Sequence, residues 1–196
     1  MADSIVTMSG WERSMRAADK VKDRLRRAAA ALQQGGVPYA VVGGNAVAEW
    51  VGRVDEGAVR NTRDVDILIR RADFDAAKKA MEAAGFVYAM VMDVEMFLDG
   101  AAGRPSDGVH LLFAGEKVRP EHTVPSPDVT ESEATAEFQV VSLDALVLMK
   151  LISNRLKDRV HILDLIGVGL VDQNWPPRFP ADLAERLQYL VDNPGS

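Results

Sequence analysis

The sequence YAVVGGNAVA at residues 39–48, followed by RNTRDVDILI at residues 60–69, decides the fold. The first run is a short apolar strand that ends in two glycines and leads into an apolar-periodic stretch, which is typical of a strand, a turn and a helix. The second run is rich in β-branched residues, which favours a second strand. The order strand, turn, helix, loop, strand predicts a mixed α/β fold.

Asp64 and Asp66 are the candidate chemical residues of the second strand. Residues two apart in a strand point to the same face, so the two carboxylates project together while Val65, Ile67 and Ile69 point into a core. Paired carboxylates repel each other, and a divalent cation relieves that repulsion. The pair therefore either binds a metal or is solvated on an exposed sheet face.

Gly43 and Gly44 favour a phosphate site at the end of the first strand. Glycines at such a junction let the backbone approach a ligand closely, and the helix that follows offers free N–H groups to a phosphate. The pattern is neither a Rossmann fingerprint, because G-x-G-x-x-G is missing, nor a P-loop, because no Gly-Lys-Ser/Thr follows. A phosphate site followed by a carboxylate pair indicates nucleotide handling.

The chain combines Val42-Gly43-Gly44, a helix and residues 62–69 in this order. This combination resembles the signature of the nucleotidyltransferase (polymerase-β-like) superfamily. Within it, the chain is similar to minimal bacterial members grouped with the abortive-infection nucleotidyltransferase toxins. Two later stretches fit this resemblance, a helix over residues 72–86 and residues 141–164. The likeness extends from residue 36 to residue 166.

The resemblance implies a nucleotidyltransferase-like mixed sheet, α/β or α+β, flanked by helices and followed by a helical C-terminal segment. The expected organisation is an N-terminal helix at residues 1–36, an α/β core at 37–141 and helices at 142–196, in one compact domain. The implied activity is transfer of NMP from an NTP to a hydroxyl of RNA, protein or a small molecule, with Mg²⁺ or Mn²⁺ held by Asp64 and Asp66. A toxin-like role would bring tRNA or a protein as acceptor and a cognate antitoxin as partner.

The resemblance also implies a third carboxylate on a neighbouring strand, where this chain has His110 within residues 109–113. By strand parity His110 points away from the apolar face, either as a ligand that suits Mn²⁺ better than Mg²⁺ or as a general base. The alternative is a structural histidine hydrogen-bonded within the sheet. Glu95 and Asp93 are possible substitute acids. Loss of the third carboxylate would leave slow transfer or none.

Lys150 lies on the otherwise apolar face of a helix predicted to begin at Ser142. A lysine there either extends its charged end to the surface or needs a partner, which is a triphosphate, one of the active-site carboxylates or a core acid. The resemblance places a lysine here facing the nucleotide, and Asn154 continues near the same face. The remaining expected nucleotide-binding residues flank the two motifs: Gly43, Gly44, Asn45, Thr62 and Arg63.

The remaining elements follow from periodicity and from helix start and stop signals. Helices are predicted at residues 11–34, 45–53, 74–84, 142–156, 159–168 and 180–191. Further strands are predicted at residues 86–91, 95–98, 109–113 and 138–141. Residues 120–137, with three prolines and five acidic residues, are predicted to be an irregular surface loop.

The composition of the chain limits the classes of protein and of chemistry that it can represent. The 196 residues are 47% hydrophobic and 27% charged, as in ordinary globular proteins, and the absence of cysteine excludes disulfides and thiol catalysis. A net charge of −6 argues against broad nucleic-acid coating, although residues 11–34 hold seven Lys/Arg against three acids. Residues 1–10 have no sustained apolar run, and no stretch is long enough to span a bilayer. A cytoplasmic location without membrane attachment is expected.

Two other function classes remain open. A nucleotide-binding or interaction module that has lost catalysis is favoured by His110 at the third-ligand position. A metal-dependent phosphohydrolase would use the same two aspartates without an acceptor, but the chain lacks the histidine-rich cluster that many such enzymes need. Base preference, acceptor and oligomeric state do not follow from the sequence.

Overall fold

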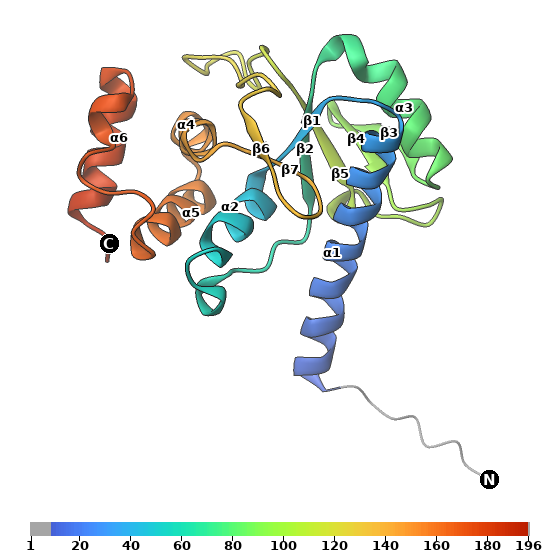
Figure 1. Ribbon diagram of the computed structural model, residues 1–196, viewed down its shortest axis with the longest axis horizontal. Coiled ribbons are helices and arrows are strands. Elements are labelled where there is room, and N and C mark those ends of the chain that lie inside the picture. The colour runs from blue at the N-terminus through green and yellow to red at the C-terminus, as the bar shows by residue number, and fades with distance from the viewer. Residues whose placement is uncertain (1–8, 196) are drawn as a thin grey trace.

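The computed structural model describes residues 9–195 and arranges them around one mixed sheet of seven strands (Figure 1). The strand order across the sheet is β3-β4-β5-β2-β1-β7-β6. The strands are β1 Tyr39–Val42, β2 Val65–Ile69, β3 Val87–Val91, β4 Val94–Leu98, β5 Val109–Phe113, β6 Ser132–Ala134 and β7 Gln139–Val141. The helices in this part of the chain are α1 Gly10–Gln34, α2 Gly43–Gly52, α3 Phe74–Ala83, α4 Leu143–Ser153, α5 Leu156–Gly167 and α6 Ala181–Asp192.

The centre of the sheet is β2, which pairs antiparallel with β1 and parallel with β5. In this register Asp66 lies opposite Val42 on one side and His110 on the other. β1 also pairs parallel with β7, so strands far apart in the sequence meet at the middle of the sheet. The expected mixed sheet with a helical C-terminus is confirmed.

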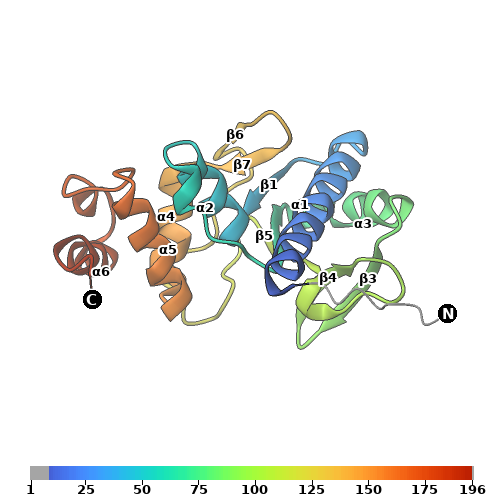
Figure 2. The same ribbon diagram turned by 90° about the horizontal axis from the view of Figure 1, so that it is seen from below.

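Helices cover both faces of the sheet, and the alternation of β2 decides which residues meet them (Figure 2). Val65, Ile67 and Ile69 are fully buried in a core shared with α1 and α3. Leu68 belongs to the opposite core, which is built with α2, α4, α5 and α6. Because residues two apart share a face, Asp66 lies on the same side of the sheet as Leu68.

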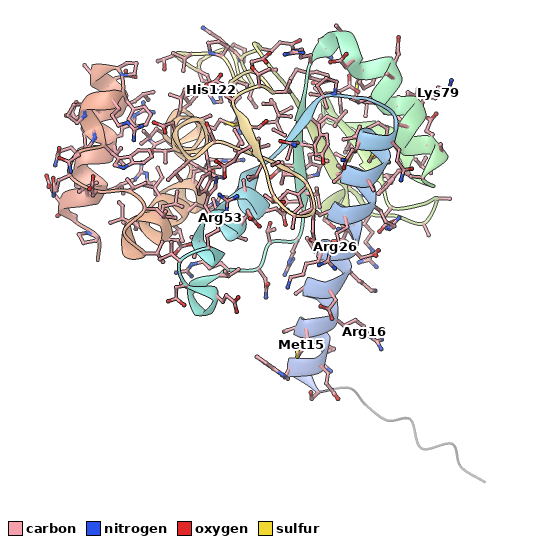
Figure 3. All side chains as sticks on the ribbon, viewed as in Figure 1. Met15, Arg16, Arg26, Arg53, Lys79 and His122 are labelled. Atoms are coloured by element: carbon pink, nitrogen blue, oxygen red, sulfur yellow. The ribbon has the colours of Figure 1, made fainter. Side chains whose placement is uncertain are left out.

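The N-terminal turns of the first helix, α1, extend beyond the body of the protein (Figure 3). Ser9 accepts a hydrogen bond from the Glu12 N–H, and the Glu12 carboxylate accepts one from the Ser9 N–H, so a capping box begins the helix. The buried positions of α1 start at Val21. The preceding turns, which include Met15 and Arg16, are exposed and extend beyond the body of the protein (Figure 3).

The two predicted helix boundaries around residue 155 are wrong. The helix predicted to reach Leu156 ends at Ser153, because Asn154 has a left-handed backbone with φ of +47° and ends the helix. The next helix starts at Leu156 rather than Arg159, since Asp158 accepts a hydrogen bond from the Arg155 N–H and caps the first turn.

The predicted irregular loop at residues 120–137 contains a short strand. β6 pairs antiparallel with β7, with Ser132 opposite Val141, and extends the sheet at that edge. The acidic composition that suggested a loop is compatible with a three-residue edge strand, because charged side chains protect an exposed edge.

Within residues 9–195 no helix combines the length and the apolar character needed to cross a bilayer. The prediction about an N-terminal signal rests mainly on residues 1–8, which lie outside the described residues.

His161 of α5 gives the fold a testable pH dependence. Its Nδ1 is buried and is the single such side-chain atom without a hydrogen-bond partner in the described part of the chain. Burial, followed by the nearby charge of Lys150, lowers the pKa of His161 from 6.5 to about 4. Between these values the unfolded chain binds a proton that the folded chain does not, so the free energy of unfolding falls as the pH drops from 6.5 to 4.

We predict that His161→Gln reduces this acid-induced loss of stability by at most about 3 kcal/mol. Urea unfolding of both proteins at pH 7 and pH 4.5 measures the difference. Equal pH dependence in the two proteins would contradict the prediction.

Candidate functional site

Asp64, Asp66 and His110 converge at the end of the sheet where β2 begins. His110 Nδ1 lies 3.4 Å from Asp66 Oδ1 and 3.8 Å from Asp64 Oδ2. One potential ligand atom from each side chain lies within 4.8 Å of the others, and all three residues are partly exposed. Among residues 9–195 these three form the one cluster of this kind. Two carboxylates and an imidazole at this spacing are a donor set for a divalent cation.

The orientation of His110 follows from its second ring nitrogen. His110 Nε2 lies 3.2 Å from the carbonyl oxygen of Pro105, and a carbonyl oxygen can only accept. Nε2 is therefore the donor, and in the neutral ring the lone pair of Nδ1 is directed at the two carboxylates. A hydrogen bond with Asp66 raises the pKa of His110, against the opposing effect of burial. Without a cation, the two carboxylates stabilise a proton on Nδ1, which is the direction of this pKa shift.

Asp64 is held by two neighbours. The Thr62 hydroxyl donates to Asp64 Oδ1 at 2.8 Å, and the Asn45 side-chain amide donates to the Asp64 carbonyl oxygen at 2.8 Å. Burial alone would raise the pKa of the Asp64 carboxyl, but hydrogen bonds from the Thr62 hydroxyl and from the backbone of Asp64 outweigh it and lower the pKa. The charges of Lys157 and His110 add smaller effects in the same direction. The carboxylate is thus ionised and fixed in direction before any ligand arrives.

The glycine turn lies directly against the two aspartates. A Cβ at Gly43 would lie 2.0 Å from Asp66 Oδ2, and the φ of Gly43 is +68°, so both space and backbone conformation require glycine. A Cβ at Gly44 would lie 2.9 Å from the Thr62 hydroxyl. α2 begins at this turn rather than at Asn45. The start of α2, with its unpaired N–H groups, therefore borders the carboxylates.

Lys150 belongs to a buried ion cluster at the junction of α4 and α5. It is 5% exposed, and its Nζ donates to Asp158 Oδ1 at 3.1 Å. Asp158 is fully buried and accepts a second bond from Arg155 Nε at 2.7 Å. Burial lowers the pKa of Lys150, and the charges of Asp158 and, more weakly, Asp66 oppose that lowering. The observed partner is a core acid, the alternative that the sequence left open beside a triphosphate.

The cluster adds positive charge on the side of the carboxylates. The charges of Asp66 and Asp64 contribute to the raised pKa of Arg155, after the larger effects of Asp158 and burial. The sequence prediction did not include Arg155 among the site residues, and it continued the helix past Asn154 to residue 156. With the helix ending at Ser153, residues 154–158 follow a turn and the helical periodicity no longer applies.

The other expected nucleotide-binding residues have these contacts. Arg63 is exposed, and its backbone carbonyl accepts a hydrogen bond from Arg24. The Asn154 side-chain oxygen accepts one from Arg159 Nε at 2.9 Å. Sequence reasoning missed Arg24 and Pro105, because their contacts depend on long-range packing and no local motif marks them.

A pocket of about 300 Å³ opens beside Asp66 and His110. Its lining combines residues 110–113 of β5 with charged residues of the β3–β4 hairpin and of the segment after β5. The lining residues outside β5 are Asp66, Arg71, Asp93, Val94, Glu95, Glu116, Lys117 and Val118. The two acids that the sequence offered as substitutes for a third carboxylate, Asp93 and Glu95, therefore line the adjoining pocket.

Comparison with protein families gives one match. The family described as uncharacterised nucleotidyltransferase matches residues 10–126, which run from the start of α1 to the segment after β5. These residues include Gly43, Gly44 and all three members of the candidate metal cluster. No curated protein matches the chain in sequence.

Solved nucleotidyltransferase structures share the fold at low identity. An antigenic nucleotidyltransferase-like protein from Paracoccidioides brasiliensis is 18% identical, with a TM-score of 0.58 and coverage of 90% of this chain and 91% of that chain. The antibiotic-resistance factor ANT(2'')-Ia, solved in complex with adenylyl-2''-tobramycin, is 14% identical, with a TM-score of 0.52 and coverage of 91% and 99%. The similarity spans most of each chain.

Gly43→Ala tests the contact between the glycine turn and Asp66. The added methyl group would lie 2.0 Å from Asp66 Oδ2, far inside van der Waals contact, so we predict that the carboxylate is displaced and that Mn²⁺ affinity falls at least about tenfold. Isothermal titration of the metal-free protein with Mn²⁺ measures the effect.

Gly85→Ala is the matched control. Gly85 also has a positive φ, +86°, but a Cβ there meets nothing within 4 Å, so this variant carries the same kind of backbone strain without touching the site. Wild-type Mn²⁺ affinity in Gly43→Ala, or an equal loss in both variants, would contradict the assignment.

Proposed function

The chain belongs to the family of uncharacterised nucleotidyltransferases, and from this premise we propose that it transfers a nucleoside monophosphate from an NTP to an acceptor hydroxyl in a metal-dependent reaction. The observation that carries the proposal is the convergence of Asp64, Asp66 and His110 beside the Gly43–Gly44 turn. Family membership supports nucleotidyl transfer in general. The metal, the site residues and the acceptor are our own proposals beyond family membership.

The residues present fit a divalent cation. Asp64 and Asp66 offer carboxylate oxygens, and His110 offers the one nitrogen that Pro105 leaves free. Two carboxylates suit Mg²⁺, and the added imidazole favours Mn²⁺. When bound, the cation would neutralise charge that develops on the transferring phosphoryl group. Because His110 has a single free nitrogen, it serves either as a ligand or as a general base, and not as both at once.

Groups that attract the negative charge of a triphosphate lie on two sides of the carboxylates. The start of α2 at Gly43–Gly44 offers backbone N–H groups to the β- and γ-phosphates. Arg155 and Lys157 lie close enough to the aspartates to act on them electrostatically. Lys150 adds positive charge on this side from its buried position. Thr62, Asn45, Arg63 and Asn154 complete the set of residues that we assign to the nucleotide site, with Thr62 and Asn45 acting by holding Asp64.

The proposed reaction is an in-line displacement. The acceptor hydroxyl oxygen forms a bond to the α-phosphorus, and the bond from that phosphorus to the oxygen bridging the β-phosphate breaks. Pyrophosphate leaves with the electron pair of that bond. The hydroxyl proton passes to solvent or, where Nδ1 is free, to His110. The residues contribute orientation of the substrate and electrostatic stabilisation of the transition state.

The pocket beside Asp66 and His110 is our candidate for the acceptor site, since it opens onto the same two residues. RNA, including tRNA, a protein and a small molecule all carry suitable hydroxyl groups. The ANT(2'')-Ia complex holds adenylyl-2''-tobramycin, an adenylylated small molecule, which gives precedent for that class on this fold. A toxin-like role with a tRNA or protein acceptor and a cognate antitoxin rests on the sequence resemblance.

A second candidate is a nucleotide-binding module of the same fold without catalysis. The observation that favours it is His110 in the position opposite Asp66, where the superfamily pattern calls for a carboxylate. This candidate requires NTP binding without turnover, so a transfer assay separates the two.

We predict that the wild-type protein transfers label from at least one of the four α-labelled NTPs to cellular RNA, protein or small molecules in the presence of Mn²⁺ or Mg²⁺. Asp64→Asn/Asp66→Asn removes the two carboxylate charges at nearly constant volume and is expected to abolish transfer. Chromatography and gel analysis of the labelled products identify the acceptor class. NTP binding by a folded wild type that incorporates no label would favour the binding module.

His110→Asp tests the third-ligand assignment. Replacing the imidazole with a carboxylate gives a site of three oxygen donors, which suits Mg²⁺ better. We predict that the ratio of transfer activity in Mg²⁺ to that in Mn²⁺ rises in this variant, while His110→Ala loses activity with both metals. An unchanged metal preference in His110→Asp would show that His110 does not contact the cation.

A further inference from the structure

Arg24 is a buried arginine that contacts two segments leading to the candidate metal site. It lies on α1 and is 6% exposed. Its Nη1 donates to the carbonyl oxygen of Arg63 at 3.3 Å, and its Nε lies 3.3 Å from Asp99 Oδ2. Arg63 immediately precedes Asp64. Asp99 begins the segment between β4 and β5, in which the carbonyl oxygen of Pro105 contacts His110.

One guanidinium therefore links the carboxylate side of the site to the histidine side. Moving the Arg63 carbonyl moves the backbone that carries Asp64, and moving the 99–108 segment moves the group that orients His110. Burying an arginine is costly unless its donors are satisfied, and the forked guanidinium satisfies two directions at once. A lysine has a single terminal nitrogen and cannot reproduce both contacts with the same geometry.

Asn45 holds the same backbone from the other side. Its amide donates to the Asp64 carbonyl oxygen, one residue beyond the carbonyl that Arg24 contacts. The peptide between Arg63 and Val65 is thus fixed by side chains from two helices, α1 and α2. Of Arg24 and Asn45, it is Arg24 that also contacts the segment leading to His110.

We propose that Arg24 is a positioning residue for the candidate metal site, which sets the distance between the two carboxylates and His110. The inference rests on the proposed function for the identity of that site. It predicts that loss of Arg24 changes metal affinity rather than only the stability of the fold.

Arg27 provides a matched control on the same helix. Its Nη2 lies 2.6 Å from Asp99 Oδ1, so it shares the acid with Arg24, and its guanidinium also contacts Asp23 and the Phe86 ring. These contacts attach α1 to the same segment, and none of the contacts described for Arg27 involves Arg63. We therefore expect that replacing either arginine loosens α1 from this segment. Displacement of the backbone that carries Asp64 is expected when Arg24 is replaced and not when Arg27 is replaced.

The test is isothermal titration with Mn²⁺ of the wild type, Arg24→Met, Arg24→Lys and Arg27→Met, with thermal unfolding of each. We expect Arg24→Met to lose at least about tenfold in Mn²⁺ affinity, Arg24→Lys to lose less and Arg27→Met to stay near the wild type. Wild-type affinity in Arg24→Met would overturn the inference, as would equal losses in the Arg24→Met and Arg27→Met proteins. If Arg24→Met does not fold, the comparison of Arg24→Lys with Arg27→Met decides in the same way.

A crystal structure of Arg24→Met without metal, or of Arg24→Lys where the methionine variant does not fold, separates this inference from the proposed function. We expect the separation of His110 Nδ1 from the two carboxylates to exceed the 3.4 and 3.8 Å of the intact site. Unchanged separations would overturn the inference. A wild type that binds no Mn²⁺ would count against the proposed metal site, and the crystal structures would still decide whether Arg24 positions these side chains.

Discussion

The register of β2 between β1 and β5 is the constraint on which the rest of the site depends. Asp66 lies opposite Val42 and His110 in this register, and Val65, Ile67 and Ile69 fill the core under α1 and α3. A shift by one residue would turn those apolar side chains out of the core and bury the carboxylates, which is costly on both counts. The apolar residues of β2 therefore stabilise the arrangement that brings two like charges together.

The repulsion created by this register is offset by several neighbours. His110 Nδ1 lies 3.4 Å from Asp66 Oδ1, Thr62 donates to Asp64, and the α4–α5 junction contributes positive charge. The Gly43 turn lies so close to Asp66 that the backbone itself limits where the carboxylate can go. These contacts come from four separate stretches of the chain, and each acts on Asp64, on Asp66 or on both.

The sequence predicted the parts of this arrangement that depend on local patterns. Alternation gave the strand and the shared face of Asp64 and Asp66, and the Gly43–Gly44 pair gave the turn before α2. It could not predict the break after Ser153, because the left-handed conformation of Asn154 is not marked by a glycine. The position of Arg155 was lost with that boundary.

Long-range contacts were beyond reach for a different reason. The charge on Lys150 called for a partner, and the fold brings Asp158 to it from the next helix. Likewise, the apolar stripe of α1 predicts packing on the sheet but says nothing about the hydrogen bonds of Arg24, because such pairings depend on how elements meet in three dimensions.

The most direct test of the central claim is a crystal structure of the protein with Mn²⁺ and a non-hydrolysable NTP analogue. The anomalous signal of manganese locates the ion without reference to activity. The account predicts a manganese peak within coordinating distance of Asp64, Asp66 and His110 Nδ1, with the triphosphate at the start of α2. A manganese ion elsewhere, or a nucleotide bound away from the Gly43–Gly44 turn, would contradict it.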